Sequence, residues 1–510
     1  MNALYVLMID HWTYQGYSVL GCRIRYNKNF GKTSVTVVKG KEIEKEKAPV
    51  YVEKFAGLLP CDGHKATEIL ACLRENEMVH DRCQLVFGDN ASNMKKTTRI
   101  AHLHAEKTRH EASDSEGSAS SGSEKEQSNA DIDDAEDQDR VPGALPFTPG
   151  LKFILVFTAL GCIGHLLNII FKDYMGQMSD EKKTKPELKK LKKIVARIRR
   201  KASVRRKLRE AMWDMDDRPK WLDVGLMIIQ AINNTRWWSA GRAFFRLTVI
   251  LNHIGREKFS DILGISISEL EADYIIENCE VFEVFDQALC AVQKANRGMG
   301  TCLELILNVG IVIFTVGNER SQEKFEKYFG TVRLVDRVYK FDLKYHEDND
   351  FVMQFHKCSL LTDPDTNQKF YTAPSITRIC KDIRSNFDAA SHDATPTTPT
   401  RTTTQSTPIT PVSGIRDLLK LRPVTVQAAP LKKFTAEELA IGKREALGIP
   451  ACTGGVESDF SATGFLTESR AASMKPKMLE AQMLVRSHRE SADLIELVVI
   501  KILEGRRVGK

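Results

Sequence analysis

The stretch Gln84–Met94, which reads QLVFGDNASNM, constrains the fold of this chain more than any other. A short apolar run stops at Gly88 and delivers Asp89 into a polar turn, after which the residues are typical of a helix start. Open α/β sheets bind ligands where their buried strands end, and a carboxylate held there suits a metal ion with oxygen ligands. In the alternative interpretation, Asp89 only caps the following helix. This stretch alone leaves both interpretations open.

The preceding residues predict a strand-rich unit with a second carboxylate. An apolar run ends at Asp10, two alternating segments follow, and helical spacing precedes the strand that ends before Asp89. The expected elements are strands over Ala3–Ile9, Tyr17–Tyr26 and Thr33–Val38, a helix over Lys65–Met78 and a fourth strand over Leu85–Phe87. This order places Asp10 and Asp89 each at the C-terminal end of a strand. Together they form a candidate metal-binding pair.

Two short sequences carry a family resemblance. IDHWT at Ile9–Thr13 and GDNASNM at Gly88–Met94 resemble the first two catalytic blocks of hAT-superfamily transposases. The resemblance implies an α/β ribonuclease-H-like core interrupted by a large, mainly α-helical insertion domain, with C-terminal helices. It also implies that Asp10 and Asp89 are catalytic.

A third segment, Leu447–His488, is similar to the C-terminal block of the same family. Glu457 falls on the catalytic glutamate of that block, although Ser458 replaces the usual Arg and Thr453 the usual Ser. The resemblance therefore implies three metal-binding carboxylates: Asp10, Asp89 and Glu457. Such a set would hold two Mg²⁺ (or Mn²⁺) ions for DNA strand cleavage and transfer. The helix after this block is the one with which the family packs its subunits, so we expect a homo-oligomer.

The segment GCIGHLLNIIF contains Cys162 and His165 at C-x-x-H spacing. A zinc site would need two more ligands at suitable spacing, so the bare pattern favours a core helix with a structural Cys and His. The segment also resembles a C-x-x-H block of hAT transposases. The apolar stretch Leu151–Phe171 is about long enough to span a membrane. Polar groups and glycines in its second half favour a buried segment, and we expect no membrane partner.

The charge of the chain is divided unevenly. The formal net charge is +7, yet residues 111–139 hold eleven acidic side chains against Lys125 alone, which leaves the remainder strongly basic. Lys182–Arg209 holds fifteen Lys or Arg against Glu187 and keeps helical apolar spacing, so it predicts one helix with a basic face. We expect this face to contact the DNA backbone through Lys189, Lys190, Lys192, Lys193, Arg197, Arg199, Arg200, Lys201, Arg205 and Arg206. The alternatives are a solvated face and a nuclear-import signal.

A further family block lies at Asn233–Ser239, which reads NNTRWWS. In hAT transposases the matching T-R-W segment lies by the cut DNA end. The resemblance implies that Arg236 contacts phosphate and that Trp237 stacks on a base, which is worth roughly 1–3 kcal/mol. In the alternative interpretation, this segment only begins a helix and an aromatic side chain packs in the core.

These features predict five segments and two possible functions. The segments are a first core part over 1–112, an acidic disordered insertion over 113–150, a helical domain over 151–384, a Thr/Pro-rich linker over 385–431 and a final core part with the dimerisation region over 432–510. The first function is that of a nuclear, DNA-binding, metal-dependent transposase. The alternative is a catalytically inactive, domesticated DNA-associated dimerising protein. Members of the family usually begin with a BED zinc finger, whereas here Met1 lies at the edge of the first strand and the sequence has no C-x-x-C pair.

Overall fold

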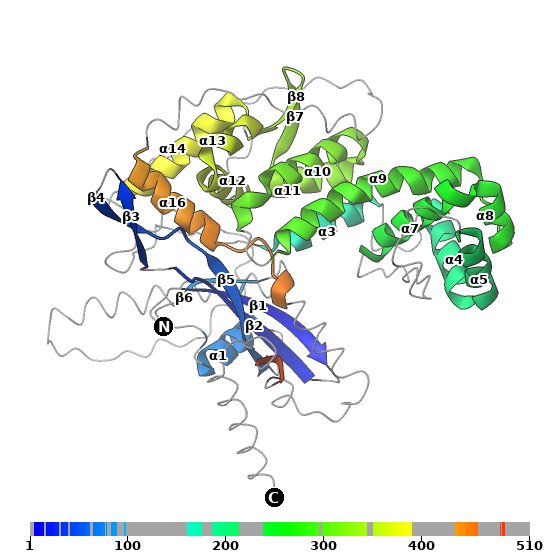
Figure 1. Cartoon of the computed structure of the whole chain (residues 1–510), viewed down its shortest axis with the longest axis horizontal. Helices are drawn as coiled ribbons and strands as arrows, with labels where there is room; N and C mark the ends of the chain where they lie inside the picture. Colours follow the sequence, from blue (N-terminus) through cyan, green and yellow to red (C-terminus); the bar gives the residue numbers. More distant parts are fainter. Residues whose placement is uncertain are drawn as a thin grey trace, which may run out of the picture. The chain divides into compact units, whose positions relative to one another are not determined.

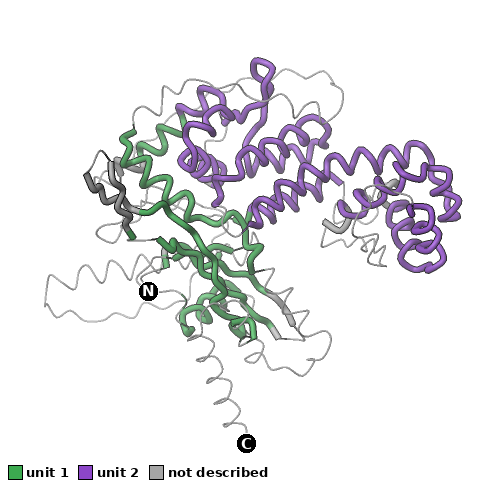
Figure 2. Tube along the Cα trace, in the orientation of Figure 1, with its two compact units in different colours: residues 1–162, 378–402, 431–510 green, residues 163–377, 403–430 purple. Residues whose placement is uncertain are grey.

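The structure is a computed structural model of the whole chain (Figure 1). It describes residues 5–14, 17–29, 32–38, 41–61, 65–76, 78, 83–88, 96–97, 161–175, 186–213, 238–294, 298–343, 350–389, 434–456, 480 and 482–484. The chain divides into two compact units (Figure 2). Unit 1 comprises residues 1–162, 378–402 and 431–510, and unit 2 comprises residues 163–377 and 403–430.

Unit 1 contains a four-stranded mixed sheet with the strand order β5-β2-β1-β6. Its strands are β1 (Tyr5–Tyr14), β2 (Tyr17–Asn27), β5 (Tyr51–Pro60) and β6 (Cys83–Phe87). β2 pairs antiparallel with both β1 and β5, whereas β6 pairs parallel with β1. Parallel neighbours need a crossover connection, and helix α1 (Ala66–Glu75) lies between β5 and β6 in the sequence. The predicted α/β class is confirmed at this level.

The core of unit 1 lies between the sheet and α1. Leu7, Ile9 and Leu20 from the central strands pack in one buried cluster with Ile69 and Leu73 of the helix. The buried α1 residues recur at helical spacing, which explains why the segment folds as an amphipathic helix. The predicted helix over Lys65–Met78 and the predicted fourth strand are confirmed.

The prediction for the third strand of the sheet was wrong. The residues predicted for it, Thr33–Val38, form β3, which pairs with β4 (Lys41–Glu46) in a separate two-stranded sheet. The third strand is β5, which buries Phe55, Leu58 and Leu59. Burial of these large side chains contributes more hydrophobic free energy than the Thr/Ser/Val run could, which accounts for the choice of β5.

Unit 2 is mainly helical among its described residues. Its helices are α3 (Ile163–Tyr174), α4 (Pro186–Arg200), α5 (Ala202–Ala211), α7 (Trp238–Ile254), α8 (Arg256–Leu263), α9 (Glu269–Val292), α10 (Leu303–Val316), α11 (Glu319–Phe329), α12 (Asp350–Thr362) and α13 (Pro364–Asn367), with short 3₁₀ turns at Met299–Cys302 and Gln368–Phe370. Helix α14 (Ala373–Ala389) begins in unit 2, and its residues from Arg378 belong to unit 1. The described residues within 240–383 are therefore chiefly helical.

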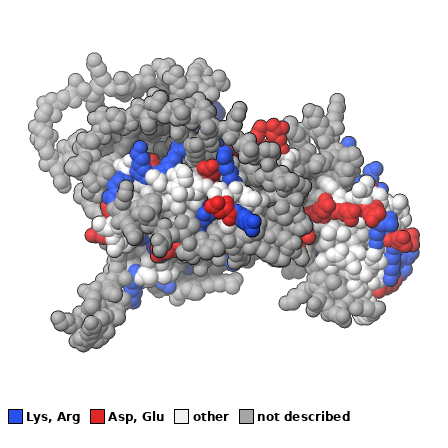
Figure 3. All heavy atoms as spheres, turned by 90° about the horizontal axis from the view of Figure 1, so that it is seen from above, with Lys and Arg blue, Asp and Glu red and all other residues white. Residues whose placement is uncertain are grey.

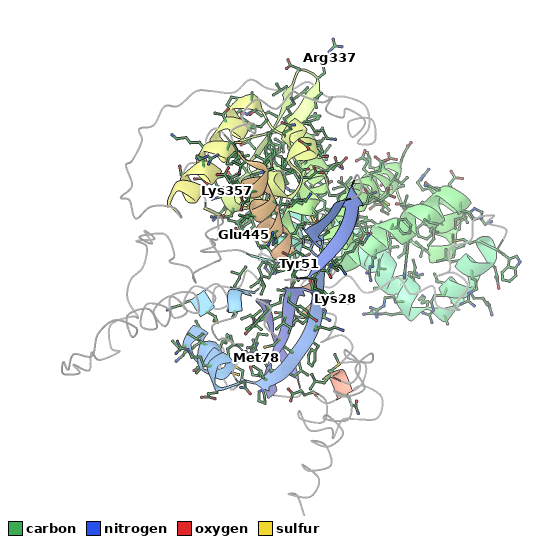
Figure 4. The ribbon with its side chains drawn as sticks, turned by 60° about the vertical axis from the view of Figure 1, so that its left-hand side comes forward. Lys28, Tyr51, Met78, Arg337, Lys357 and Glu445 are labelled. Atoms are coloured by element: carbon green, nitrogen blue, oxygen red, sulfur yellow. The ribbon has the colours of Figure 1, made fainter. Side chains whose placement is uncertain are left out.

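A hairpin interrupts these helices. β7 (Thr331–Val335) pairs antiparallel with β8 (Val338–Asp342). Asp336 and Arg337 form the two-residue turn, and both have positive φ, 51° and 64°. Such values are typical of a type I′ turn, whose twist matches that of the flanking strands. Figure 4 shows Arg337 at the tip of the hairpin.

One helical stretch among the described residues, Met299–Val316, has the length and apolar composition of a membrane span. Of this stretch, 61 % is buried inside the protein. This degree of burial is typical of a core helix, and Leu303, Ile306 and Val309 lie in the interior.

Candidate active site and nucleic-acid interface

Asp10 lies on the central strand of the unit 1 sheet. It faces Gly21 in the β1–β2 register and is partly buried. One carboxylate oxygen, Oδ1, accepts a hydrogen bond from the His11 backbone N–H at 2.8 Å. The His11 ring is held in turn by Ser18, whose Oγ lies 2.5 Å from Nε2. The prediction that Asp10 ends its strand was wrong, because β1 continues to Tyr14 along β2.

The register between β1 and β6 fixes where the two predicted Asp residues fall along their strands. The last paired residues are Met8 and Phe87, and both are buried. Asp10 and Asp89 each follow this pair by two residues in the sequence. Asp89 and Glu457 lie outside the described residues, as do Arg236 and Trp237.

The chain that leads toward Glu457 is anchored to the sheet by a buried arginine. Arg25 on β2 donates to the carbonyl oxygens of Leu447, at 3.0 Å, and Gly448, at 3.2 Å, at the end of α16 (Ala436–Gly448). Arg25 also pairs with Glu53, directly opposite on β5, with 2.8 Å between Nη1 and Oε1. Both side chains are almost completely buried.

A second arginine and an aromatic ring lie beside this pair, and Arg23 Nη1 is 4.0 Å from Glu53 Oε2. The Arg25 guanidinium carbon lies 5.3 Å from the centre of the Tyr51 ring, and the Tyr51 hydroxyl donates to Arg444 O on α16 at 2.5 Å. Figure 4 shows Tyr51 on β5 beside α16, on which Glu445 is labelled. Burial raises the pKa of Tyr51 to about 12, and the nearby Arg25 acts in the opposite direction. Burial likewise raises the pKa of Glu53, whereas Arg25 lowers it.

Cys162 is buried at the end of the first segment of unit 1. Its thiol donates to Cys452 Sγ at 3.2 Å, and the Gly454 N–H also donates to that sulfur at 3.2 Å. His165 is partly buried in α3. Among the residues that the structure describes, no three His, Cys, Asp or Glu side chains gather as a possible metal site. The structural assignment of Cys162 and His165 is therefore retained as a prediction.

The predicted single basic helix is two helices, so that prediction was wrong in one respect. Lys201 adopts an extended conformation, with φ −104° and ψ 106°, between α4 and α5. Arg205 on α5 turns back and donates to the carbonyl oxygens of Ile198, at 3.1 Å, and Arg199 near the end of α4. The first four residues of a helix leave N–H groups unpaired and the last four leave carbonyls unpaired. Arg205 satisfies two such carbonyls, which stabilises the break.

The basic side chains of α4 and α5 fall into two groups. Lys190 pairs with Glu271 on α9 with 3.3 Å between Nζ and Oε1, and Arg197 donates to Leu263 O at the end of α8. These contacts, with those of Arg205, hold the helices together. The exposed group comprises Lys189, Lys193, Arg199, Arg200, Lys201, Arg206 and Lys207. Lys192 is partly exposed. In Figure 3, blue side chains gather at one end of unit 2 next to a band of red ones.

One exposed aromatic side chain follows the basic helices. Trp213, directly after α5, is 62 % exposed. The sequence analysis did not predict Trp213 as a nucleic-acid contact. The available signal was that it closely follows the basic residues Lys207 and Arg209 in the chain.

Comparison with known proteins does not add to this geometry. No protein-family model and no curated protein matches the chain.

Sequence reasoning missed the Arg25–Glu53 pair and the meeting of Cys162 with Cys452. The alternation of Arg23 and Arg25 along the predicted second strand was a signal for the first, since both fall on one face of a strand. The second had no local signal, because 290 residues separate the two cysteines in the sequence.

Proposed function

We propose that this chain is a transposase-type protein that binds DNA and cleaves it with metal ions held by Asp10, Asp89 and Glu457. The observation that carries the proposal is the β1–β6 register, since Asp10 and Asp89 each follow its last pair, Met8 and Phe87, by two residues in the sequence. Carboxylate oxygens that lie close together suit Mg²⁺, and the shared register favours such closeness for Asp10 and Asp89. The chain order of β1, β2, β5, α1 and β6 also supports a ribonuclease-H-like core, with β3 and β4 as an addition.

In metal-dependent DNA cleavage the main task of the protein is to position the metal ions and the DNA. Bound Mg²⁺ or Mn²⁺ would activate an attacking hydroxyl and stabilise the leaving oxygen. Asp10 fits this role because it is a partly buried carboxylate on a rigid central strand. The neighbouring His11 N–H, which donates to Oδ1, helps to orient it. Arg25 positions the end of α16 and thereby the residues that precede Glu457.

The exposed basic side chains of α4 and α5 would contact the phosphate backbone. Arg199, Arg200 and Lys201 are consecutive and exposed at the junction of the two helices. Each neutralised phosphate contributes about 0.9 to the slope of log affinity against log salt concentration. Nuclear localisation and assembly into homo-oligomers through the C-terminal region are parts of the same proposal.

The deciding experiment measures nicking of supercoiled plasmid by the full-length protein with Mg²⁺ or Mn²⁺. We expect metal-dependent nicking that disappears in Asp10→Asn, Asp89→Ala and Glu457→Gln. Glu257→Gln is the matched control, because its side chain is 89 % exposed on α8. A folded protein that binds DNA but never nicks it would overturn the proposal in favour of the inactive, DNA-associated dimerising protein, the reading that Ser458 favours.

A second experiment tests the DNA interface separately. Changing Arg199, Arg200 and Lys201 together to Gln should reduce the salt slope of DNA binding by about 3. The control changes Lys327, Lys381 and Lys443, three exposed lysines on other helices, to Gln. Equal slopes for the two triple variants would exclude the α4–α5 junction as the phosphate-binding surface.

A further inference from the structure

Two cysteines far apart in the sequence meet inside unit 1. Cys162 is fully buried and Cys452 is 6 % exposed, and their sulfurs are 3.2 Å apart. A disulfide bond is about 2.05 Å long, so a shift of about 1 Å would bring the sulfurs to bonding distance. Both cysteines are reduced in the structure.

Two donors converge on one of these sulfurs. The Cys162 thiol and the Gly454 N–H each donate to Cys452 Sγ at 3.2 Å. This arrangement holds Cys452 Sγ toward Cys162 and suits a sulfur that carries negative charge after its proton leaves. Cys162 directly precedes α3, and the N-terminal end of a helix also favours negative charge.

The two cysteines lie close in sequence to segments that lead to the predicted catalytic residues. Cys162 follows Gly161, which bridges to Gly88 at the end of β6, one residue before Asp89. Cys452 precedes Glu457 by five residues. A covalent bond between the two sulfurs would fasten the chain beside β6 to the chain that leads to Glu457.

We propose that Cys162 and Cys452 form a reversible disulfide when the protein is exposed to hydrogen peroxide. The thiolate of one cysteine attacks the peroxide, breaks the O–O bond and becomes a sulfenic acid, with release of water. The second thiolate then attacks that sulfur, the S–O bond breaks, and a second water leaves as the disulfide forms. Two thiols lose two electrons and two protons, and the peroxide is reduced to two water molecules.

Other cysteines of the chain are less suited to this chemistry. Cys22, Cys61 and Cys72 share one buried cluster. Burial raises the pKa of Cys22 well above its usual range, and its neighbours Cys72, Glu480 and Cys61 add to the effect. Cys162 and Cys452 are buried as well, so the selectivity rests on geometry: their sulfurs are 3.2 Å apart, and we expect this pair to oxidise to a disulfide.

The test treats the full-length protein with hydrogen peroxide, blocks remaining thiols by alkylation and analyses tryptic peptides by mass spectrometry. We expect one cross-linked species that joins peptide 153–172 to peptide 445–470, lighter than the two reduced peptides by two hydrogen atoms. A thiol reductant should separate them. The cross-link should be absent from Cys162→Ser and Cys452→Ser and retained in Cys290→Ser, which changes the exposed cysteine.

The wild-type protein decides the matter even if a variant fails to fold. Complete alkylation of both peptides after peroxide treatment of folded protein would overturn the proposal. Cross-links from Cys162 or Cys452 only to other cysteines would overturn it too. These outcomes do not depend on nicking, so they test the disulfide independently of the proposed DNA chemistry.

Discussion

Replacing Arg25 by Met should loosen α16 from the sheet of unit 1. The Arg25 side chain is 0 % exposed, donates to two carbonyl oxygens at the end of α16 and pairs with Glu53. Met has a similar apolar stem without charge or donors. The substitution therefore removes the polar contacts and keeps much of the packing.

Two effects determine how far the free energy of unfolding falls in Arg25→Met. Removing one partner of a buried ion pair costs about 3–5 kcal/mol, because the other charge stays buried. Each buried carbonyl left without a donor costs about 1–3 kcal/mol. These effects overlap, since one side chain makes all the contacts. We expect a loss of about 3–5 kcal/mol at pH 7, of which about 1–3 kcal/mol comes from the carbonyls of Leu447 and Gly448.

The loss should depend on pH through Glu53. Burial raises the pKa of Glu53 and Arg25 opposes this effect, so the pKa rises further in Arg25→Met. A raised pKa in the folded state means that the folded protein binds a proton more tightly than the unfolded chain. The free energy of unfolding of the variant should therefore fall as pH rises from about 4.3, the ordinary Glu value, through the raised pKa of Glu53. Below that range only the carbonyl contribution remains.

Hydrogen exchange of backbone amides measures this loss locally. At pH 7 the α16 amides of Arg25→Met should lose protection by about 10²- to 5 × 10³-fold, as 1.36 kcal/mol corresponds to a factor of ten. Amides of α9, in unit 2, serve as the internal control. Adding Glu53→Gln should restore part of the protection at pH 7, because it removes a buried carboxylate that would keep only its longer ion pair with Arg23, at 4.0 Å. A double variant no better protected than Arg25→Met would refute the argument.

Three further predictions concern single contacts. Asn318→Ala should lower the free energy of unfolding of unit 2 by about 2–3 kcal/mol, measured by urea unfolding. Asn318 caps α11 and also donates to Asp173 O and Tyr174 O at the end of α3. An unchanged urea midpoint would contradict this prediction. Gly241→Ala should lower the urea midpoint, because the added Cβ would lie 1.7 Å from the Phe282 ring. Overpacking of this kind costs about 1–3 kcal/mol, whereas the better helix propensity of Ala contributes about 1 kcal/mol. A higher midpoint would show that α7 and α9 can separate. A hydrogen bond from the Thr435 N–H lowers the pKa of Glu438, and Arg384 adds to the effect. The ionised Glu438 therefore stabilises the folded state above the ordinary Glu pKa, and this stabilisation is lost as pH falls through the lowered pKa. Thermal unfolding of Glu438→Gln should accordingly show a smaller loss of stability on acidification than the wild-type protein, and parallel pH profiles would exclude this role.

Local patterns predicted those elements whose side chains bury one clear face. An apolar run located β1, alternation located β2 and helical spacing located α1, because burial of these faces stabilises them wherever they pack. The α4–α5 break could not be read from spacing, which continues across Lys201. It depends on Arg205 reaching back to the carbonyls of α4, a contact between side chain and backbone.

The sheet and the candidate site needed information about distant residues. The choice of β5 over β3 as the third strand depends on which segment buries Phe55 and Leu58 in the shared core. Residues far apart in the chain also meet at Arg25, which contacts Leu447 across 422 positions. Such pairings follow from tertiary packing, so no window of local sequence contains them.

The most direct measurement for the central claim is a crystal structure of the full-length protein grown with Mn²⁺, with the metal located by anomalous scattering. The account predicts peaks bound by carboxylate oxygens of Asp10, Asp89 and Glu457, at about 2.0–2.2 Å as for similar small divalent ions. Two peaks should lie about 3.5–4 Å apart if both metals are bound. Ordered carboxylates that point away from one another, with no metal between them, would contradict it.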